Sequence, residues 1–421
     1  MKTIAAAAAL GIAAVVAALA AGAEPGEAQR PGAAGGGALI AASTQARAVV
    51  AGELSGVAAV DVHGWRAELR VDRSLLGGVR LGDTVTIAWE ELSPGRPVRF
   101  ANGERVLVVL DALPTQSLWR KRFASADRAH GVFVVASEGD AFLSRPDGPT
   151  LDGLAHYLAM APEARAGTPG ADKLAELVRA AHPAVAREAL ALLESDARAA
   201  ALDGDGGAAL LETVRAADRD PALRAGALRL AARRGLPGSR AAADALTAPG
   251  SPIRADAYRA LAALPGGLSA DRRDGLLADA DPELRAVGIE AGGAQLARER
   301  LVQLARHDGA PSVRLAAGRA LLARSGSDAV ADVVGMLDDP EASVRSGMAE
   351  SIGALGAPAV APLRAVVDHG SERAALAAVL GISKSGRTSG PVLAAIADTH
   401  PNPSVQAFAR LALGKAPKPP Y

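Results

Sequence analysis

The chain has 421 residues, which exceeds one ordinary domain and predicts two or three. Its 46 basic and 46 acidic residues cancel, which argues against nucleic-acid binding because that function needs a clustered basic surface. The absence of cysteine excludes disulfides, thiolate chemistry and a lipid-modified amino-terminal cysteine.

Residues 1–23 have the pattern of a secretory signal peptide. Lys2 makes the start positive, the run from Thr3 onward carries no charge, and the small residues Ala21 and Ala23 precede the expected cleavage site. The run is also long enough to span a bilayer, so a retained amino-terminal membrane anchor is the alternative. After cleavage no membrane span is expected. Export without disulfides then predicts a periplasmic or secreted bacterial protein.

Residues 24–43 are predicted to be a flexible linker, because their few large apolar side chains cannot offset the entropy of ordering. Between residues 44 and 147 the pattern changes to strand period, as at Trp65, Ala67 and Leu69. Five or six such strands predict a small antiparallel β-barrel or sandwich. The order of strands and glycine turns resembles an OB-like β-domain of exported bacterial proteins. The strands are expected at 48–51, 65–72, 85–89, 106–110 and 132–135.

The densest basic and aromatic cluster of the chain lies in this β-domain, at Trp119, Arg120, Lys121, Arg122 and Phe123. In an OB-like domain such a segment can stack on a sugar or base while its charges hold an anion. Alternatively, it is a solvated connection whose two aromatic rings are fixed on the barrel. Binding of a surface glycan by the β-domain is therefore one alternative function.

Residues 148–170 are predicted to form a junction helix followed by a hinge. Leu151, Leu154 and Leu158 recur at helical spacing, which indicates the helix. The Pro and Gly residues between 162 and 170 indicate the hinge.

Residues 171–415 consist of about eight repeats with a step near thirty residues. In one of them, Val344, Met348 and Ile352 lie on one face of a helix, and Gly356 ends that helix before a second one. Each repeat is therefore predicted to be two antiparallel helices that bury their apolar faces by stacking on neighbours. The anchoring apolar residues are Val185, Leu223, Ile253, Leu284, Val313, Val344 and Val405. The proline-rich tail at 416–421 is predicted to be disordered.

An arginine follows most of these anchoring residues within two positions. Asp-Pro pairs mark loops that are expected to lie between repeats, where the aspartate is expected to cap the following helix. A degenerate repeat has Arg373 in the arginine's place. The arginines either bind loop groups of adjacent repeats and so stabilise the stack, or they form an anion-binding stripe. The balanced charge favours the first interpretation. This structural ladder comprises Arg187, Arg224, Arg254, Arg285, Arg314 and Arg345, with the loop aspartates Asp220, Asp281 and Asp339.

The recurring order of Asp-Pro, apolar-Arg and small residues resembles HEAT repeats, especially the short bacterial kind that also occurs in phycobilin lyases. The resemblance covers about residues 171–415 and implies a superhelical helix stack. The expected fold class is therefore multidomain α+β, with a small antiparallel β-barrel or sandwich followed by an all-α HEAT-like solenoid. The likeness to lyases implies one alternative function, assistance in the attachment of a bilin.

The sequence contains no recognisable nucleophile motif, phosphate loop or dinucleotide fingerprint, and no two histidines at metal-binding helical spacing. Catalytic residues, cofactors and metal ligands are therefore not assigned. The leading hypothesis is a non-enzymatic scaffold that binds a protein partner in the bacterial cell envelope. Exposed positions on the inner helices, Arg319, Glu350 and Arg410, are candidate contacts. The partner's identity and the oligomeric state do not follow from the sequence.

Overall fold

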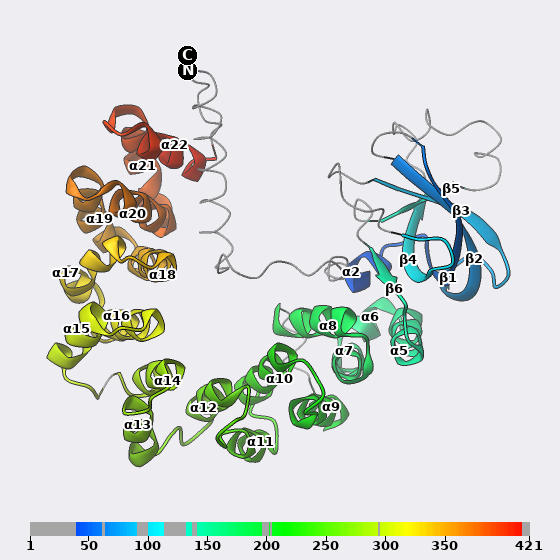
Figure 1. The fold of residues 1–421 in the computed structure, drawn as a ribbon, viewed down its shortest axis with the longest axis horizontal. Coiled ribbons are helices and arrows are strands. Elements are labelled where there is room, and N and C mark those ends of the chain that lie inside the picture. The colour runs from blue at the N-terminus through cyan, green and yellow to red at the C-terminus, as the bar shows by residue number, and fades with distance from the viewer. Residues whose placement is uncertain are drawn as a thin grey trace. The chain divides into compact units, whose positions relative to one another are not determined.

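A computed structural model describes residues 39–60, 64–90, 100–112, 132–136, 141–195, 202, 204–293 and 295–414. In this part of the chain a small β-barrel is followed by helices stacked in pairs, as the sequence predicted (Figure 1). The described residues divide into two compact units, one ending at Pro265 and one beginning at Gly266. The first unit contains the barrel and three helix pairs, and the second contains five. The predicted signal peptide at 1–23 and tail at 416–421 lie outside the described residues.

The barrel closes because its first strand has two partners. The strand order is β1-β2-β3-β5-β4, and β4 pairs again with β1. β3 and β5 run parallel, with Ile87 beside Phe133, while the other pairs are antiparallel. The strands are β1 (Ala48–Ala59), β2 (Gly64–Gly77), β3 (Thr84–Glu90), β4 (Arg105–Ala112), β5 (Val132–Val135) and β6 (Phe142–Ser144), the last of which pairs with β4.

An aromatic cluster fills the barrel. The ring of Phe100 meets Trp89 and Phe142 edge to face, with centroids 4.8 and 4.5 Å apart. The strand expected at 85–89 is present as β3, but the alternation of its residues, which is typical of a strand with one exposed face, does not correspond to its burial, because Thr86 and Ala88 on the second face are buried. Thr86 is buried there and bonds to Glu68 through its hydroxyl at 2.9 Å. The strand is therefore covered on both faces.

The predicted flexible linker is wrong at its carboxyl end, where Leu39–Ser43 form the short helix α2. Leu39 and Ile40 are fully buried. The backbone amides of Ile40 and Ala41 donate to Glu188 Oε1 at 2.8 and 3.0 Å. Glu188 belongs to α8 (Pro183–Ser195), so this segment is fixed on the first helix pair by apolar burial and by two hydrogen bonds.

The junction helix is present as α5 (Gly148–Ala159), but the predicted hinge is wrong. Residues 162–170 form α6 (Pro162–Ala166) and the first turn of α7 (Thr168–Ala180). Gly170 packs so closely that an added Cβ would lie 2.1 Å from the carbonyl oxygen of Arg165. The Pro and Gly residues of this segment therefore start helices and allow close packing, rather than providing a hinge.

Eight helix pairs follow within the described residues from Thr168 onward, and each pair contains an odd-numbered and then an even-numbered helix. 3-10 turns adjoin two of the odd-numbered helices: Gly326–Ala329 and Val334–Asp338 flank α17 (Val330–Val333), and Gly386–Thr388 precedes α21 (Ser389–Thr399). The helices after α7 are α8 (Pro183–Ser195), α9 (Gly204–Arg215), α10 (Pro221–Arg233), α11 (Ser239–Ala245), α12 (Arg254–Ala263), α13 (Ala270–Leu277), α14 (Pro282–Gly292), α15 (Arg298–His307), α16 (Pro311–Ser325), α17 (Val330–Val333), α18 (Ala342–Gly353), α19 (Ala357–His369), α20 (Glu372–Lys384), α21 (Ser389–Thr399) and α22 (Pro403–Ala412).

In the second unit the even-numbered helices α14 to α22 stack on one another in one layer, and the odd-numbered helices form the other layer (Figure 1). α19 packs extensively on α20 but only slightly on α18. The prediction that Asp-Pro loops lie between repeats is therefore wrong, because these loops join the two helices that pack together. Since both kinds of loop are short, the sequence could not distinguish them.

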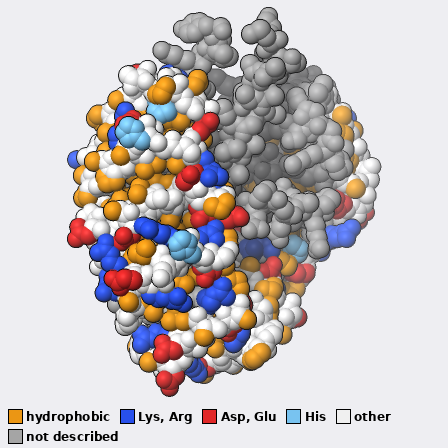
Figure 2. All heavy atoms as spheres, turned by 60° about the vertical axis from the view of Figure 1, so that its left-hand side comes forward, with side chains coloured by type: hydrophobic (Ala, Val, Ile, Leu, Met, Phe, Trp, Pro, Cys, Tyr) orange, Lys and Arg blue, Asp and Glu red, His pale blue; other side chains and the backbone are white. Residues whose placement is uncertain are grey.

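The surface of the stacked helices mixes charges of both signs with apolar side chains, as Figure 2 shows for one face of the described region. Such a surface produces no extended field of one sign. None of the described helices is both long and apolar enough to cross a bilayer.

Candidate functional site

The even-numbered helices of the second unit begin in the same way, so corresponding positions can be compared between pairs. An apolar residue three places after the N-cap is buried in α14, α16, α18 and α22, as Val344 is in α18. We call the next residue the ladder position. From α14 to α22 the ladder position is occupied by Arg285, Arg314, Arg345, Ala375 and Gln406.

A second recurring position is the C-cap of the preceding odd-numbered helix. Asp308 and Asp339 occupy it before α16 and α18. Each accepts the amide of the following N-cap residue at 2.9 Å. His400 replaces them before α22, where its Nδ1 accepts the amide of Asn402 at 3.1 Å. A carboxylate or a neutral imidazole can therefore cap the even-numbered helix from this place.

The Asp-Pro pairs do not all occupy the same position relative to the helix that follows them. Asp220 and Asp281 are themselves the N-caps of α10 and α14, as predicted. Asp339 lies two residues before the N-cap of α18, which is Glu341. Because of this shift the Asp339 carboxylate can reach the preceding helix pair as well.

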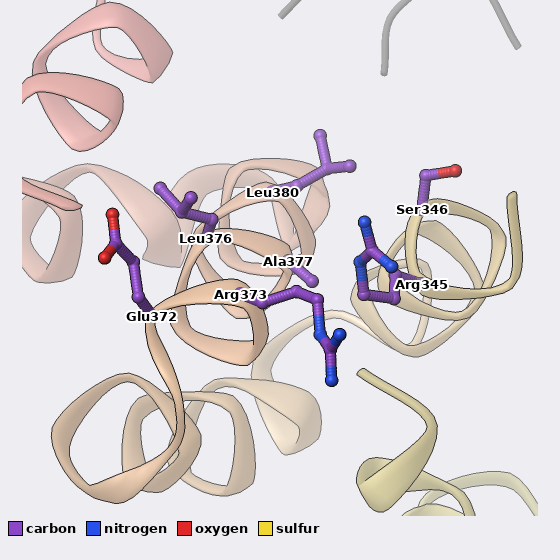
Figure 3. A pocket seen from close by; sticks show the side chains of 7 residues that line it. All are labelled: Arg345, Ser346, Glu372, Arg373, Leu376, Ala377 and Leu380. Carbon is purple, nitrogen blue, oxygen red and sulfur yellow. The ribbon is translucent and has the colours of Figure 1, made fainter. Parts of the chain in front are cut away.

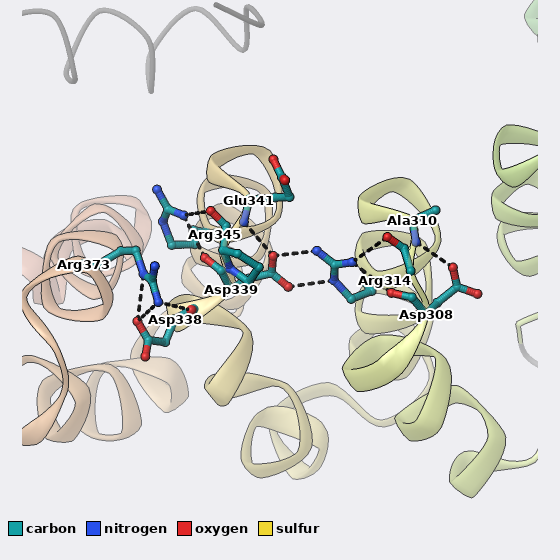
Figure 4. A network of polar contacts seen from close by, with 10 residues as sticks. Asp308, Ala310, Arg314, Asp338, Asp339, Glu341, Arg345 and Arg373 are labelled. Atoms are coloured by element: carbon teal, nitrogen blue, oxygen red, sulfur yellow. Dashed lines mark hydrogen bonds and ion pairs between the residues drawn. The ribbon is translucent and has the colours of Figure 1, made fainter.

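Arg314 makes the full set of ladder contacts, and we call such a set a rung (Figure 4). Its Nη1 donates to the carbonyl oxygens of Asp308 and Gly309 at 2.9 and 3.3 Å. Its Nε and Nη2 bind both carboxylate oxygens of Asp339, in the next helix pair, at 2.8 and 2.7 Å. Hydrogen bonding to Asp339 raises the pKa of Arg314. The guanidinium therefore connects two consecutive helix pairs.

Arg285 makes the same kind of rung with weaker contacts. It donates to the carbonyl oxygens of Asp279 and Ala280 at 3.2 and 3.0 Å and to Asp308 Oδ1 at 3.3 Å. In α22, Gln406 keeps the carbonyl contact, donating to the carbonyl oxygen of His400 at 2.6 Å. These contacts support the interpretation that the ladder stabilises the stack.

The ladder arginines of the first unit contact carbonyl oxygens or a loop aspartate. Arg224 is buried and its Nε donates to the carbonyl oxygen of Val214 at 3.0 Å. Arg254 donates in the same way to Thr247 at 2.9 Å. Arg187 lies one residue later in its helix, and its Nη1 is 3.8 Å from Asp220 Oδ2.

The rung at Arg345 is incomplete. Its Nη1 donates to the carbonyl oxygens of Asp339 and Pro340 at 2.7 and 2.8 Å. In the next helix pair, the C-cap residue of α19 is Gly370, which has no side chain that could bind Arg345. Nε and Nη2 of Arg345 have no hydrogen-bond partner among the described residues. Burial lowers the pKa of Arg345, and the nearby charge of Arg373 lowers it further.

The cause is a loop that is one residue shorter. One residue separates C-cap from N-cap before α16, α18 and α22, whereas Gly370 and the N-cap Ser371 are adjacent. An added Cβ at Gly370 would lie 2.6 Å from the carbonyl oxygen of Val366, so this tight turn excludes an aspartate. The prediction that Arg373 takes the ladder arginine's place is wrong. The ladder position is Ala375, while Arg373 binds Asp338 Oδ1 at 3.0 Å through Nε.

A pocket opens beside this incomplete rung, between α18 and α20 (Figure 3). Its volume is about 320 Å³. Leu376, Ala377 and Leu380 form an apolar wall, and Arg345 and Arg373 lie at its edge. The remaining lining residues are Ser346 and Glu372, and the Glu372 carboxylate points away from both arginines. We call this site the Arg345 pocket.

This part of the chain resembles a known family. Residues 298–383 match the family model described as HEAT repeats. The match runs from α15 to α20 and so includes the Arg345 pocket and the complete HEAT-like rung at Arg314. No curated protein matches the chain.

The other predicted contact residues are not brought together by the structure. Arg319 of α16 is exposed, and its Nε donates to the hydroxyl of Ser351 in α18 at 3.3 Å, so it connects two consecutive helix pairs. Glu350 is exposed on α18. Arg410 donates to the carbonyl oxygen of Ala397 at 2.5 Å and to Gln406, so it connects α21 and α22. The predicted cluster at Trp119, Arg120, Lys121 and Arg122 lies outside the described residues.

A metal or catalytic site would require ionisable side chains that lie close together. Within the described ranges, no group of three or more histidine, aspartate and glutamate side chains could hold a metal ion. His182 and His400 accept amide hydrogens through Nδ1 near helix starts, which is the capping role expected of loop histidines. Burial lowers the pKa of His182, which favours the neutral imidazole that this acceptor role requires.

Proposed function

We propose that the protein is a non-enzymatic scaffold of the bacterial cell envelope, whose HEAT-like repeats bind a protein partner. The observation that carries this proposal is the Arg345 pocket on the layer of even-numbered helices, inside the region that matches HEAT repeats. Stacked helix pairs commonly provide extended binding surfaces. The pocket combines an apolar wall with the partly buried Arg345, and arginine is one of the residue types enriched in protein-binding hot spots.

Export is supported by the sequence of residues 1–23. The β-domain is proposed to be OB-like, since its five strands close in the order β1-β2-β3-β5-β4 with β1 returning to β4. In this account it is a second module that accompanies the repeats.

Crosslinking in the native envelope tests the proposed function. A photoreactive amino acid would replace Ser346 in the pocket or Leu81 on the β-domain, where 72% of the side chain is exposed. We expect a discrete protein adduct from position 346 in the envelope fraction. Adducts from position 81 alone, or none from position 346, would contradict protein binding by the repeats. Recovery of the chain only from the cytosol would contradict the envelope role.

A further inference from the structure

Successive rungs of the ladder differ in where the carboxylate comes from. At Arg314 the outer edge of the guanidinium, Nε and Nη2, binds Asp339 from the next helix pair. Arg345 has the same carbonyl contacts on its inner side, but no carboxylate of the described residues binds that edge. Gly370 stands where the aspartate would be. Arg345 therefore retains two donors in the geometry that suits a carboxylate.

The nearest acidic groups do not supply the missing ligand. Asp339 is bound by Arg314 through both oxygens. Asp338 accepts from the Ser371 hydroxyl at 2.7 Å and from Arg373. Glu341 is exposed, and although its charge acts on Arg345, it forms no hydrogen bond with Nε or Nη2 of that residue in the described part of the chain. A partly buried guanidinium that lacks a counter-ion on one edge gains more from an incoming carboxylate than a fully solvated one does.

We propose that the Arg345 pocket binds an aspartate or glutamate side chain of the protein partner together with a neighbouring apolar side chain. The partner's carboxylate completes the arginine ladder from outside, as Asp339 completes it within the chain. The apolar neighbour covers Leu376 and Leu380. This inference rests on the proposed function and specifies the kind of segment that the repeats recognise.

The apolar wall distinguishes this ligand from a free anion. Leu376, Ala377 and Leu380 offer no hydrogen bonds through their side chains, so phosphate or sulfate would leave them exposed to water. The cavity of about 320 Å³ is at the small end of ligand sites, which suits a few side chains of a peptide rather than a large cofactor.

A tripeptide probe tests the inference on the full chain. Acetyl-Glu-Leu-Leu-amide would be titrated while the leucine methyl signals of Leu376 and Leu380 are followed by NMR. We expect saturable shifts at both residues, and at least tenfold weaker binding of acetyl-Gln-Leu-Leu-amide and of acetyl-Glu-Gly-Gly-amide. Equal shifts with the glutamine peptide, or with inorganic phosphate, would overturn the inference.

Two matched variants assign the binding to Arg345. Arg345→Gln is expected to fold, because Gln406 makes the same carbonyl contact in α22, and to lose at least tenfold in affinity for the glutamate peptide. Arg364→Gln, which alters an ion pair with Asp368 within α19 and does not line the pocket, should bind like the wild type. Equal binding by the wild type and by Arg345→Gln would contradict the assignment.

The peptide experiment tests the carboxylate ligand, whereas the crosslinking experiment tests the proposed function, so either hypothesis can be refuted without the other. An envelope adduct from position 346, combined with no preference for glutamate over glutamine, would leave the proposed function standing and refute the carboxylate ligand. Selective peptide binding without any envelope adduct would support the pocket's specificity and refute the proposed function.

Discussion

Arg314 and Arg345 occupy the same position in consecutive helix pairs, yet their surroundings differ. The Arg314 side chain is 9% exposed and binds a carboxylate that is 8% exposed. Arg345 is partly exposed and binds only carbonyl oxygens. The difference arises in the loop before α20. This loop is one residue shorter than the loop before α18 and has Gly370 at the position that Asp339 occupies there. One arginine therefore holds the stack together, while the other is left open to a partner.

The largest expected effect is on the closed rung. Arg314→Ala leaves the Asp339 carboxylate buried without its cation, so we expect a loss of about 3–5 kcal/mol from the unfolding free energy of the second unit. Urea unfolding followed by circular dichroism measures it. Arg298→Ala is the control, since its ion pair with Asp332 is 46% exposed on the arginine side and should cost less than about 1 kcal/mol. Similar losses in both variants would refute the special role of the buried rung.

Glu188 extends the comparison to a buried acid that binds backbone amides instead of an arginine. Glu188→Ala leaves the amides of Ile40 and Ala41 unpaired, and we expect it to destabilise the first unit by about 1–3 kcal/mol. Glu188→Gln keeps an acceptor and should cost much less. Chemical unfolding of both variants, and proteolysis near α2, measure the difference. Equal stability of wild type and Glu188→Ala would mean that α2 is not held by this side chain.

The pH dependence of the same pair has a defined sign. Burial raises the pKa of Glu188 above its ordinary value of 4.5. The folded state therefore binds the proton more tightly than the unfolded state, and this contribution is complete below pH 4.5 and is lost as the pH rises through the folded pKa. We expect the stability of Glu188→Gln relative to the wild type to increase over that rise. A difference that is independent of pH would contradict the raised pKa.

Arg345→Gln should change stability least among the ladder arginines. It removes no buried ion pair and retains a carbonyl contact like that of Gln406, so we expect a loss of about 1 kcal/mol or less. The melting temperature measures this directly. A loss as large as that of Arg314→Ala would show that Arg345 is a structural rung after all.

The smallest expected effect is at Asp338, which is 48% exposed and pairs with Arg373. Hydrogen bonds from Ser371 and then Arg373 lower the pKa of Asp338. Its contribution is therefore present above the ordinary value of 3.8 and is lost as the pH falls through the folded pKa. Asp338→Asn should cost less than about 1 kcal/mol at pH 7. A larger loss would mean that Arg373 depends on this pair for its position at the pocket.

Most of the fold could be predicted from local patterns. The periods of Trp65 to Val71 and of Val344 to Ile352 indicated a strand and a helix, and both are present. Features that depend on distant partners could not be predicted. Leu39 and Ile40 lie at the end of a Gly-rich and Ala-rich stretch, and their burial depends on Glu188, 148 residues away from Ile40. The parallel pairing of β3 with β5 has no local signal either.

The candidate site was only partly visible in the sequence. The repeated arginines predicted the ladder, because the same side chain recurs beside the same apolar anchor. The open rung was missed, since Arg373 stands close to the expected position and hides the deletion before α20. Counting from the helix starts would have revealed it. Ala375, where the other pairs of the second unit have arginine or glutamine, was the available signal.

The comparison between closed and open rungs can be tested in one measurement. Leu315 and Ser346 follow the two arginines directly, so a photoreactive residue at either position reports on the adjacent rung in the native envelope. The account predicts a discrete protein adduct from position 346 that disappears with Arg345→Gln, and none from position 315. Equal adducts from both positions, or an adduct from position 346 that persists with Arg345→Gln, would contradict it.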